Sequence, residues 1–262
     1  MSRAASPSDF RFLRYADERD IVRITLARPP LNILTIEVLH ELGEALERAA
    51  ARPALKALVL AAEGKAFCAG VAVEDHLGEQ ARPMLEAFHH VFRRLRALDC
   101  ATLAAVQGAA LGGGAELATF CDLVVAAESA TFGQPEIKVG VFPPIAALRY
   151  PARIGPARTL RLLLSGDVID ATEAERIGLV DRVVPAARLD DVVESELARF
   201  RALSAVVLRL TKRAVLATAG LDFAEGLALL EELYHDELMT TADAEEGLRA
   251  FVEKRRPVWR DR

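Results

Sequence analysis

The sequence predicts an α/β protein built around a largely parallel sheet. Strand-like and helix-like segments alternate along the first two thirds of the chain, and the later strands are continuously apolar. Continuously apolar strands are typical of a parallel sheet whose two faces are both covered by helices. After about residue 184 the pattern changes to four helical segments without a strand candidate. We therefore expect a sheet-containing core followed by a helical region.

The first strands are expected at residues 10–15 (FRFLRY) and 21–27 (IVRITLA), where apolar and polar residues alternate until Pro29 and Pro30 interrupt the pattern. A helix is expected from Thr35, its predicted N-cap. Its apolar stripe consists of Leu39, Leu42, Leu46 and Ala49. Residues 56–62 (KALVLAA) then form a continuous apolar run, which predicts a strand buried on both faces.

The next segments repeat this alternation. A second amphipathic helix has its apolar side at Met84, Leu85, Phe88, Phe92 and Leu95. Buried strands are expected at residues 102–108 and 122–127, and a helix is expected to begin between them, in the turn at residues 112–114.

The helical region is expected to pack against the core or against another subunit. Helices are expected to start at Asp222 and Asp243, because each has a glutamate three residues later, as in a capping box. An apolar stripe in this region consists of Phe223, Leu227, Leu230, Tyr234 and Leu238. Such a stripe has to pack against the core or another subunit. We therefore divide the chain into a core, residues 1–184, and a helical region for association, residues 185–262.

Composition excludes several classes of protein. The 262 residues carry 33 Lys and Arg against 38 Asp and Glu, a net charge of −5, which gives no basic footprint for nucleic acid. Residues 1–20 have no apolar core typical of a signal peptide, and the most apolar stretch, 101–127, contains polar residues that argue against a membrane span. The three cysteines form no CxxC pair. We expect a cytoplasmic protein that binds neither membrane nor nucleic acid.

Two glycine-bearing turns follow buried strands, at residues 65–75 (KAFCAGVAVED) and 107–118 (QGAALGGGAELA). Three consecutive glycines entering a helix indicate unusual dihedral angles or a close approach of backbone. The unpaired N–H groups at a helix N-terminus can stabilise a developing oxyanion. The alternative is a tight turn whose glycines serve packing only, and the residues alone leave both readings open.

Glu116 and Glu136 are the candidate acid–base residues. Each is expected in the first turn of a helix, where a carboxylate can also serve only to complement the helix dipole. Both lie in apolar sequence (AELATF and PEIKV), and burial there would raise their pKa towards the range useful for proton transfer.

Other reactive residue types give weaker evidence for a catalytic or metal site. The five histidines have no metal-ligand spacing, so we expect no metal site, and we expect His89 and His90 to be solvated. No serine lies in a G-x-S-x-G elbow. Cys68 lies in the first glycine turn and could be a nucleophile, but no base is near it in sequence, so we expect a small buried thiol.

These segments, in this order, resemble the crotonase superfamily, the enoyl-CoA hydratase/isomerase family. The matching motifs, which cover nearly the whole chain, are RPPLNIL (28–34), KAFCAG (65–70), ALGGGAELA (110–118), CDLVVAA (121–127), FGQPEIKVG (132–140), AERIGLVDRVVP (174–185) and FVEKRRP (251–257). The resemblance implies a ClpP/crotonase-like spiral of ββα units with C-terminal helices that build a homotrimer or a dimer of trimers.

The resemblance also implies the site. In the family two backbone amides hold the thioester oxygen, and these fall on Val71 and Gly113. The two catalytic glutamates fall on Glu116 and Glu136, and which is the base stays open. Further substrate contacts are assigned to Ala69, Pro144, Phe251 and Lys254. No cofactor is implied, because coenzyme A is part of the substrate.

The implied activity is hydration of an α,β-unsaturated acyl-CoA. Alternatives are an enoyl-CoA isomerase, a hydrolase of a CoA thioester or β-diketone with the same fold, and a weakly catalytic CoA-ester binding protein. Two positions depart from the family pattern. Ala72 stands where Asp is common, and residues 142–151 (FPPIAALRYP) replace a glycine-rich loop. Because Pro144 has no N–H, the pocket is expected to be stiffer. This loop is more similar to hydratases of cyclic dienoyl-CoA thioesters, of the cyclohexa-1,5-dienecarbonyl-CoA hydratase type.

Overall fold

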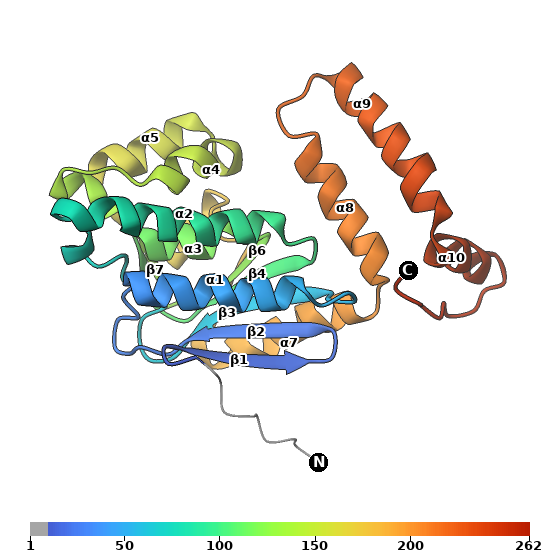
Figure 1. Cartoon of the computed structure of the whole chain (residues 1–262), viewed down its shortest axis with the longest axis horizontal. Coiled ribbons are helices and arrows are strands. Elements are labelled where there is room, and N and C mark those ends of the chain that lie inside the picture. The colour runs from blue at the N-terminus through green and yellow to red at the C-terminus, as the bar shows by residue number, and fades with distance from the viewer. Residues whose placement is uncertain (1–9) are drawn as a thin grey trace, which may run out of the picture.

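The computed structural model describes residues 10–262 (Figure 1). Six strands form the main sheet in the order β1-β2-β3-β4-β6-β9, with β1 antiparallel to β2 and the other neighbours parallel. Their bounds are β1 Leu13–Glu18, β2 Ile21–Leu26, β3 Ala57–Ala62, β4 Ala101–Val106, β6 Leu123–Ala127 and β9 Arg182–Val184. The expected α/β class with a parallel-rich sheet is confirmed.

Both faces of this sheet are covered by helices. Helices α1 (Ile36–Ala50) and α2 (Ala81–Ala97) lie over one face, and α7 (Leu189–Arg201) lies over the other (Figure 1). Alternate residues of β3 show the division, because Leu58 and Leu60 join the α1–α2 core whereas Ala57 and Val59 pack with α7. This double burial explains why the strand is apolar throughout.

A second, smaller sheet lies beside the main one and positions the site. It has the order β5-β7-β8, with β5 (Ala110–Leu111) parallel to β7 (Thr131–Gly133) and β8 (Val168–Asp170) antiparallel to β7. Around it lie α3 Gly113–Phe120, the 3₁₀ helix η3 Pro135–Val139, α4 Pro144–Ile154, α5 Pro156–Ser165 and α6 Ala171–Arg176. Short 3₁₀ segments also occur at Glu74–His76, Gly78–Gln80 and Ala186–Arg188.

The last helices form an arm that projects from the core. Helices α8 (Ala205–Ala217), α9 (Phe223–Glu232) and α10 (Ala242–Val252) run away from the sheet, with a π-helical turn at Leu233–Glu237 and a 3₁₀ turn at Leu238–Thr240 before α10 (Figure 1). Lys212 ties α8 to the core, because its Nζ lies 2.7 Å from Oδ2 of Asp122 and donates to the Cys100 carbonyl. The boundary expected at residue 184 stays a prediction. Helix α7, which follows it, packs on the sheet and not with the arm.

Some local expectations are corrected. The first strand starts at Leu13 instead of residue 10. Asp222 caps α9 as expected, since its side chain accepts from the Glu225 amide. The cap of α10 is Thr241, whereas Asp243 lies inside the helix and accepts from the backbone amides of Arg260 and Asp261. Asp243 is therefore recruited by the returning C-terminal segment, which sequence spacing does not show.

Three further expectations concern exposure. Nε2 of His89 is buried and has no hydrogen-bond partner within the described part of the chain, so the expected solvated side chain is wrong for that nitrogen. No helix among residues 10–262 is both long and apolar enough to cross a bilayer. Residues 1–9, on which part of the signal-peptide expectation depends, lie outside the described residues.

Candidate active site

The two glycine-bearing turns lie directly against each other. The Cys68 amide donates to the Ala109 carbonyl at 3.0 Å, and the Leu111 amide donates to the Cys68 carbonyl at 2.9 Å. A Cβ at Gly108 would lie 1.9 Å from the Lys65 carbonyl oxygen, and one at Gly114 would lie 2.2 Å from the Cys68 carbonyl oxygen. Only glycine permits this approach, so the packing interpretation is correct for Gly108 and Gly114.

The same contact leaves two amides available to a ligand. On the first turn the Ala69 and Ala72 amides donate to the Leu31 and Leu34 carbonyls. Among residues 10–262, by contrast, the Val71 N–H has no hydrogen-bond acceptor. Gly113 is the first residue of α3, and the first amide to bond back along that helix is that of Glu116, so the Gly113 N–H also has no acceptor among the described residues.

The residues that carry these two amides lie against each other. The Cγ2 atom of Val71 lies 2.7 Å from where a Cβ of Gly113 would be. Two free N–H groups on adjacent turns, one of them at a helix N-terminus, form the arrangement that stabilises a developing oxyanion. The glycine turns therefore pack closely and leave two amides that could hold an oxyanion.

Glu116 is buried in the first turn of α3, with 2 % of its surface exposed. Its Oε1 accepts from the Ala146 amide at 2.7 Å, in the first turn of α4. Burial raises the pKa of Glu116 to about 8, aided by the charge of Glu136, while the Ala146 and Ile145 amides oppose the rise. The side chain thus titrates near neutral pH.

Glu136 approaches the same place from η3, where Pro135 occupies the first position as expected. Its Oε1 lies 2.5 Å from where a Cβ of Gly112 would be, so its carboxyl group lies directly against the start of the GGG turn. Burial raises the pKa of Glu136 above its usual range. Two acids with raised pKa therefore converge beside the two free amides.

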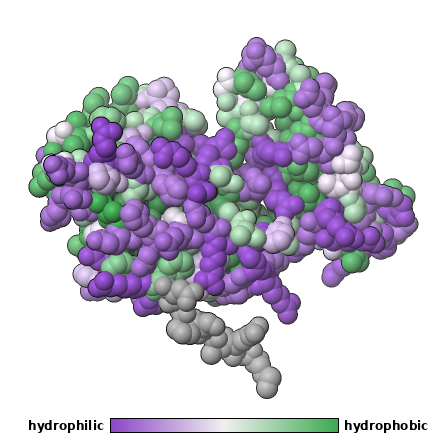
Figure 2. Space-filling view, in the orientation of Figure 1, coloured by the Kyte–Doolittle hydropathy of each residue, from purple (hydrophilic) through white to green (hydrophobic). Residues whose placement is uncertain are grey.

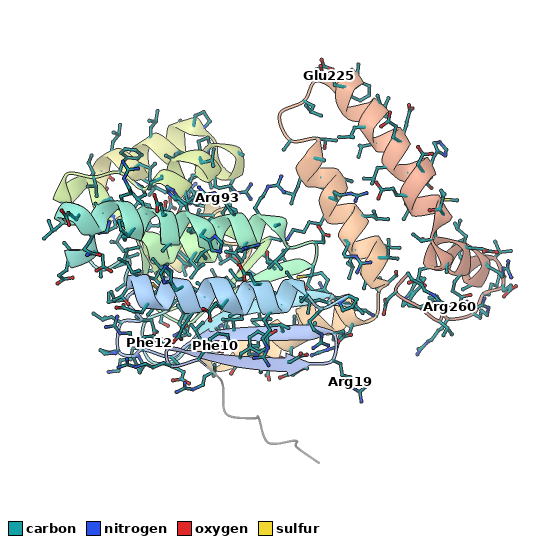
Figure 3. The ribbon with its side chains drawn as sticks, in the orientation of Figure 1. Phe10, Phe12, Arg19, Arg93, Glu225 and Arg260 are labelled. Carbon is teal, nitrogen blue, oxygen red and sulfur yellow. The ribbon has the colours of Figure 1, made fainter. Side chains whose placement is uncertain are left out.

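The other candidate residues are distributed unevenly. Ala69 lies in the first turn, but its amide is already bonded to Leu31. Pro144 is the first residue of α4, the helix whose next amides face Glu116. Phe251 is 84 % exposed on α10, and Lys254 follows that helix. Figure 1 shows α10 at the end of the arm, away from α3 and β7, and Figure 3 labels Arg260 beside that helix, so α10 and the segment that follows it lie away from their own chain's glutamates.

The remaining questions from the sequence concern Cys68 as a nucleophile and a metal site. Cys68 is fully buried, and burial raises the pKa of its thiol to about 12, as expected of a packing cysteine and not of a nucleophile. Among residues 10–262, no group of three or more His, Cys, Asp or Glu side chains could hold a metal ion.

Sequence reasoning missed three contributors. The Ala146 amide donates a hydrogen bond to Glu116, 30 residues earlier in the chain. Gln134 contacts the Glu136 carboxyl group, and Tyr150 contacts Gln134. Gln134 is part of the FGQPE motif, and its position two residues before Glu136 is the signal that could have found it. Tyr150 gives no such signal, because only the packing of α4 brings it close.

Comparisons with known proteins show which family this chain is similar to. The profile of the enoyl-CoA hydratase/isomerase family matches residues 16–262. The cyclohexa-1,5-dienecarbonyl-CoA hydratase of Thauera aromatica is 40 % identical, with both chains covered completely. The structure is similar to an enoyl-CoA hydratase of Bacillus anthracis, with TM-score 0.91 and 30 % identity over 96 % of this chain and 100 % of that one. It is also similar to an enoyl-CoA hydratase of Mycobacterium smegmatis, with TM-score 0.90 and 31 % identity over 95 % of this chain and 99 % of that one.

The raised pKa of Glu116 predicts a specific dependence of stability on pH. Between the ordinary value of 4.5 and about 8, the folded protein holds a proton that the unfolded chain has released. The free energy of unfolding should therefore fall as pH rises through this range. Glu116→Gln removes this loss. The free energy of unfolding of the variant should therefore exceed that of the wild type by about 2–4 kcal/mol at pH 9 and by little at pH 4. Urea denaturation at several pH values measures the difference, and parallel curves would contradict a buried Glu116.

Proposed function

The chain belongs to the enoyl-CoA hydratase/isomerase family, and from this membership we propose that it hydrates the double bond of an α,β-unsaturated acyl-CoA thioester. The observation that carries the proposal is the convergence of Glu116 and Glu136 on the turn that also presents the free amides of Val71 and Gly113. Hydration of a thioester needs both elements, because its carbonyl oxygen gains charge while one proton leaves the attacking water and another is added at Cα.

The amides act on the carbonyl. When water adds at Cβ, negative charge develops on the thioester oxygen, and the N–H groups of Val71 and Gly113 stabilise this enolate. One such donor typically contributes about 2.7–4 kcal/mol. Because both amides belong to turns locked together by backbone hydrogen bonds, they need little reorganisation during the reaction.

The glutamates move the protons. One takes a proton from the attacking water, and the other supplies the proton at Cα, with the roles exchanged in the reverse reaction. Their raised pKa values suit both tasks near neutral pH. All these groups belong to the protein chain, so we propose that no cofactor takes part and that coenzyme A enters only as part of the substrate.

We further propose a cyclic dienoyl-CoA as the preferred substrate. One support is the 40 % identity with the Thauera aromatica cyclohexa-1,5-dienecarbonyl-CoA hydratase over the whole chain. The second is the wall beside Glu116. Here the segment that is glycine-rich in typical hydratases starts a helix at Pro144, with Ile145 and Ala146 buried. A helical wall keeps a fixed shape, which suits a rigid ring better than a flexible chain.

A panel of thioesters tests the reaction and the substrate class. Chelator-treated enzyme without added cofactor should convert both crotonyl-CoA and cyclohexa-1,5-dienecarbonyl-CoA to alcohols, with the higher kcat/KM for the cyclic ester. Product analysis by mass spectrometry distinguishes the outcomes. A shifted double bond without alcohol would indicate an isomerase, free coenzyme A a hydrolase, and binding without turnover a CoA-ester binding protein.

Substitution of the acids tests their roles. Glu116→Gln and Glu136→Gln should each lower kcat at least about 10²-fold, because an amide cannot exchange the proton. Each variant should bind the CoA ester nearly as well as the wild type, since the amides of Val71 and Gly113 are unchanged. Steady-state kinetics and calorimetric binding measure the two effects. Unchanged turnover in both variants would refute the acid–base assignment.

We propose that the arm assembles the protein into a homotrimer or a dimer of trimers. The apolar stripe that runs from α9 into the following π-helical turn is not covered by the rest of residues 10–262, since Phe223, Leu227 and Tyr234 are exposed. Figure 2 shows apolar surface along the arm formed by α8 and α9. A neighbouring subunit would cover this surface, and Phe251 and Lys254 would then reach a coenzyme A site across the subunit boundary.

Sedimentation equilibrium tests the assembly. The wild type should have the mass of three or six chains, whereas Leu227→Glu should shift the protein toward monomers. Asp222→Asn keeps an N-cap at the start of the same helix and serves as the control. A monomeric wild type at micromolar concentration would contradict the proposal.

A further inference from the structure

Three polar side chains form a buried line behind Glu136. They are Gln134, Tyr150 and Thr119, exposed by 1 %, 2 % and 2 %. Each comes from a different element, since Gln134 follows β7, Tyr150 lies on α4 and Thr119 lies on α3. Buried polar groups are costly unless hydrogen-bonded, so a line of three requires a structural reason.

The contacts define the direction of this line. With its amide nitrogen toward Glu136, Gln134 donates to Oε1 at 3.3 Å and to Oε2 at 3.2 Å, and its oxygen accepts from the Tyr150 hydroxyl at 2.8 Å. The Thr119 hydroxyl lies 3.4 Å from that of Tyr150 and donates to the Ala115 carbonyl. The opposite amide orientation would place the Gln134 oxygen against two carboxylate oxygens.

The two carboxylate oxygens of Glu136 favour the orientation in which the Gln134 N–H faces them, and the Tyr150 hydroxyl completes that orientation. Burial raises the pKa of Tyr150 to about 12, so the hydroxyl keeps its proton throughout the physiological range and can donate to the Gln134 oxygen. A hydrogen bond to the carboxylate stabilises its charged form and fixes its direction.

We propose that Tyr150 is a positioning residue, whose hydroxyl holds the Gln134 amide in the orientation that donates to the carboxylate of Glu136. The Tyr150 hydroxyl hydrogen-bonds Gln134 and lies 3.4 Å from the Thr119 hydroxyl, so it acts on Glu136 through Gln134. The kinetic part of this inference rests on the proposed hydratase function, whereas the effect on Glu136 itself does not.

The titration of Glu136 measures the effect directly. The ionisable groups that face Glu136 are Glu116, on α3, and Tyr150, on α4, and the charge of Glu136 raises the pKa of both. The experiment is therefore done in a Glu116→Gln background, which removes the coupled carboxyl group. Glutamate labelled with ¹³C at Cδ then reports the protonation of Glu136 by NMR in the free protein.

Tyr150→Phe removes only the hydroxyl and keeps the ring. The expected result is a lowering of the Glu136 ionisation constant by about tenfold, because Gln134 is no longer held as a donor. Tyr15→Phe is the matched control, since the Tyr15 hydroxyl is also buried but lacks a hydrogen-bond partner among the described residues. It should leave the Glu136 titration unchanged. An unchanged titration in folded Tyr150→Phe would overturn the proposal.

A double substitution tests whether the effect passes through Gln134. Gln134→Met keeps the approximate shape of the side chain but lacks the amide. In that background Tyr150→Phe should produce no further change in the Glu136 titration. A tenfold change that persists there would show that Tyr150 acts on Glu136 by another route, which would also refute the proposal.

Kinetics complete the test. With Glu116 restored, Tyr150→Phe should lower kcat about tenfold with little change in KM, and it should move the limb of the pH profile that belongs to Glu136 to higher pH. The NMR result stands without turnover. A shifted titration in a protein that hydrates no thioester would therefore refute the proposed function alone. An unchanged titration in a protein that does hydrate thioesters would refute only the role of Tyr150.

Discussion

The site depends on how closely the turn after β3 lies against the turn after β4. The backbone of the second turn passes so near the Lys65 and Cys68 carbonyls that no side chain fits at Gly108 or Gly114. Hydrogen bonds on both sides of Cys68 then fix the two turns as one unit. The free amides of Val71 and Gly113 have a fixed separation because neither turn can move without the other.

The acids are held under a second constraint, which is their removal from water. Burying Glu116 costs stability whenever it is charged, and only the first amides of α4 offset part of that cost. The compensation is incomplete, and the carboxyl group is left able to gain or lose a proton near neutrality. The same burial that weakens the fold therefore creates the chemical capability, as is common at functional sites.

Neighbouring elements give the two acids different surroundings. Glu116 receives backbone amides from α4, whose geometry is fixed by the helix, whereas Glu136 receives the side-chain amide of Gln134, which can point either way. The direction of that amide depends on a hydroxyl of α4. Helix α4 thus contacts both acids, directly in one case and through Gln134 in the other.

The sequence by itself determined the class of fold, because continuous apolar strands are a local signal of double burial. It also singled out Glu116 and Glu136 as candidates, because the GGG turn and the PE pair lie within short segments, but their roles came from the family resemblance and stay proposals. Tertiary structure alone decided which distant groups surround them. The Ala146 amide, the Tyr150 hydroxyl and the recruitment of Asp243 by the C-terminal segment all depend on contacts between segments 16 to 30 residues apart. Local pattern carries no information about such contacts, because they arise only when helices pack in three dimensions.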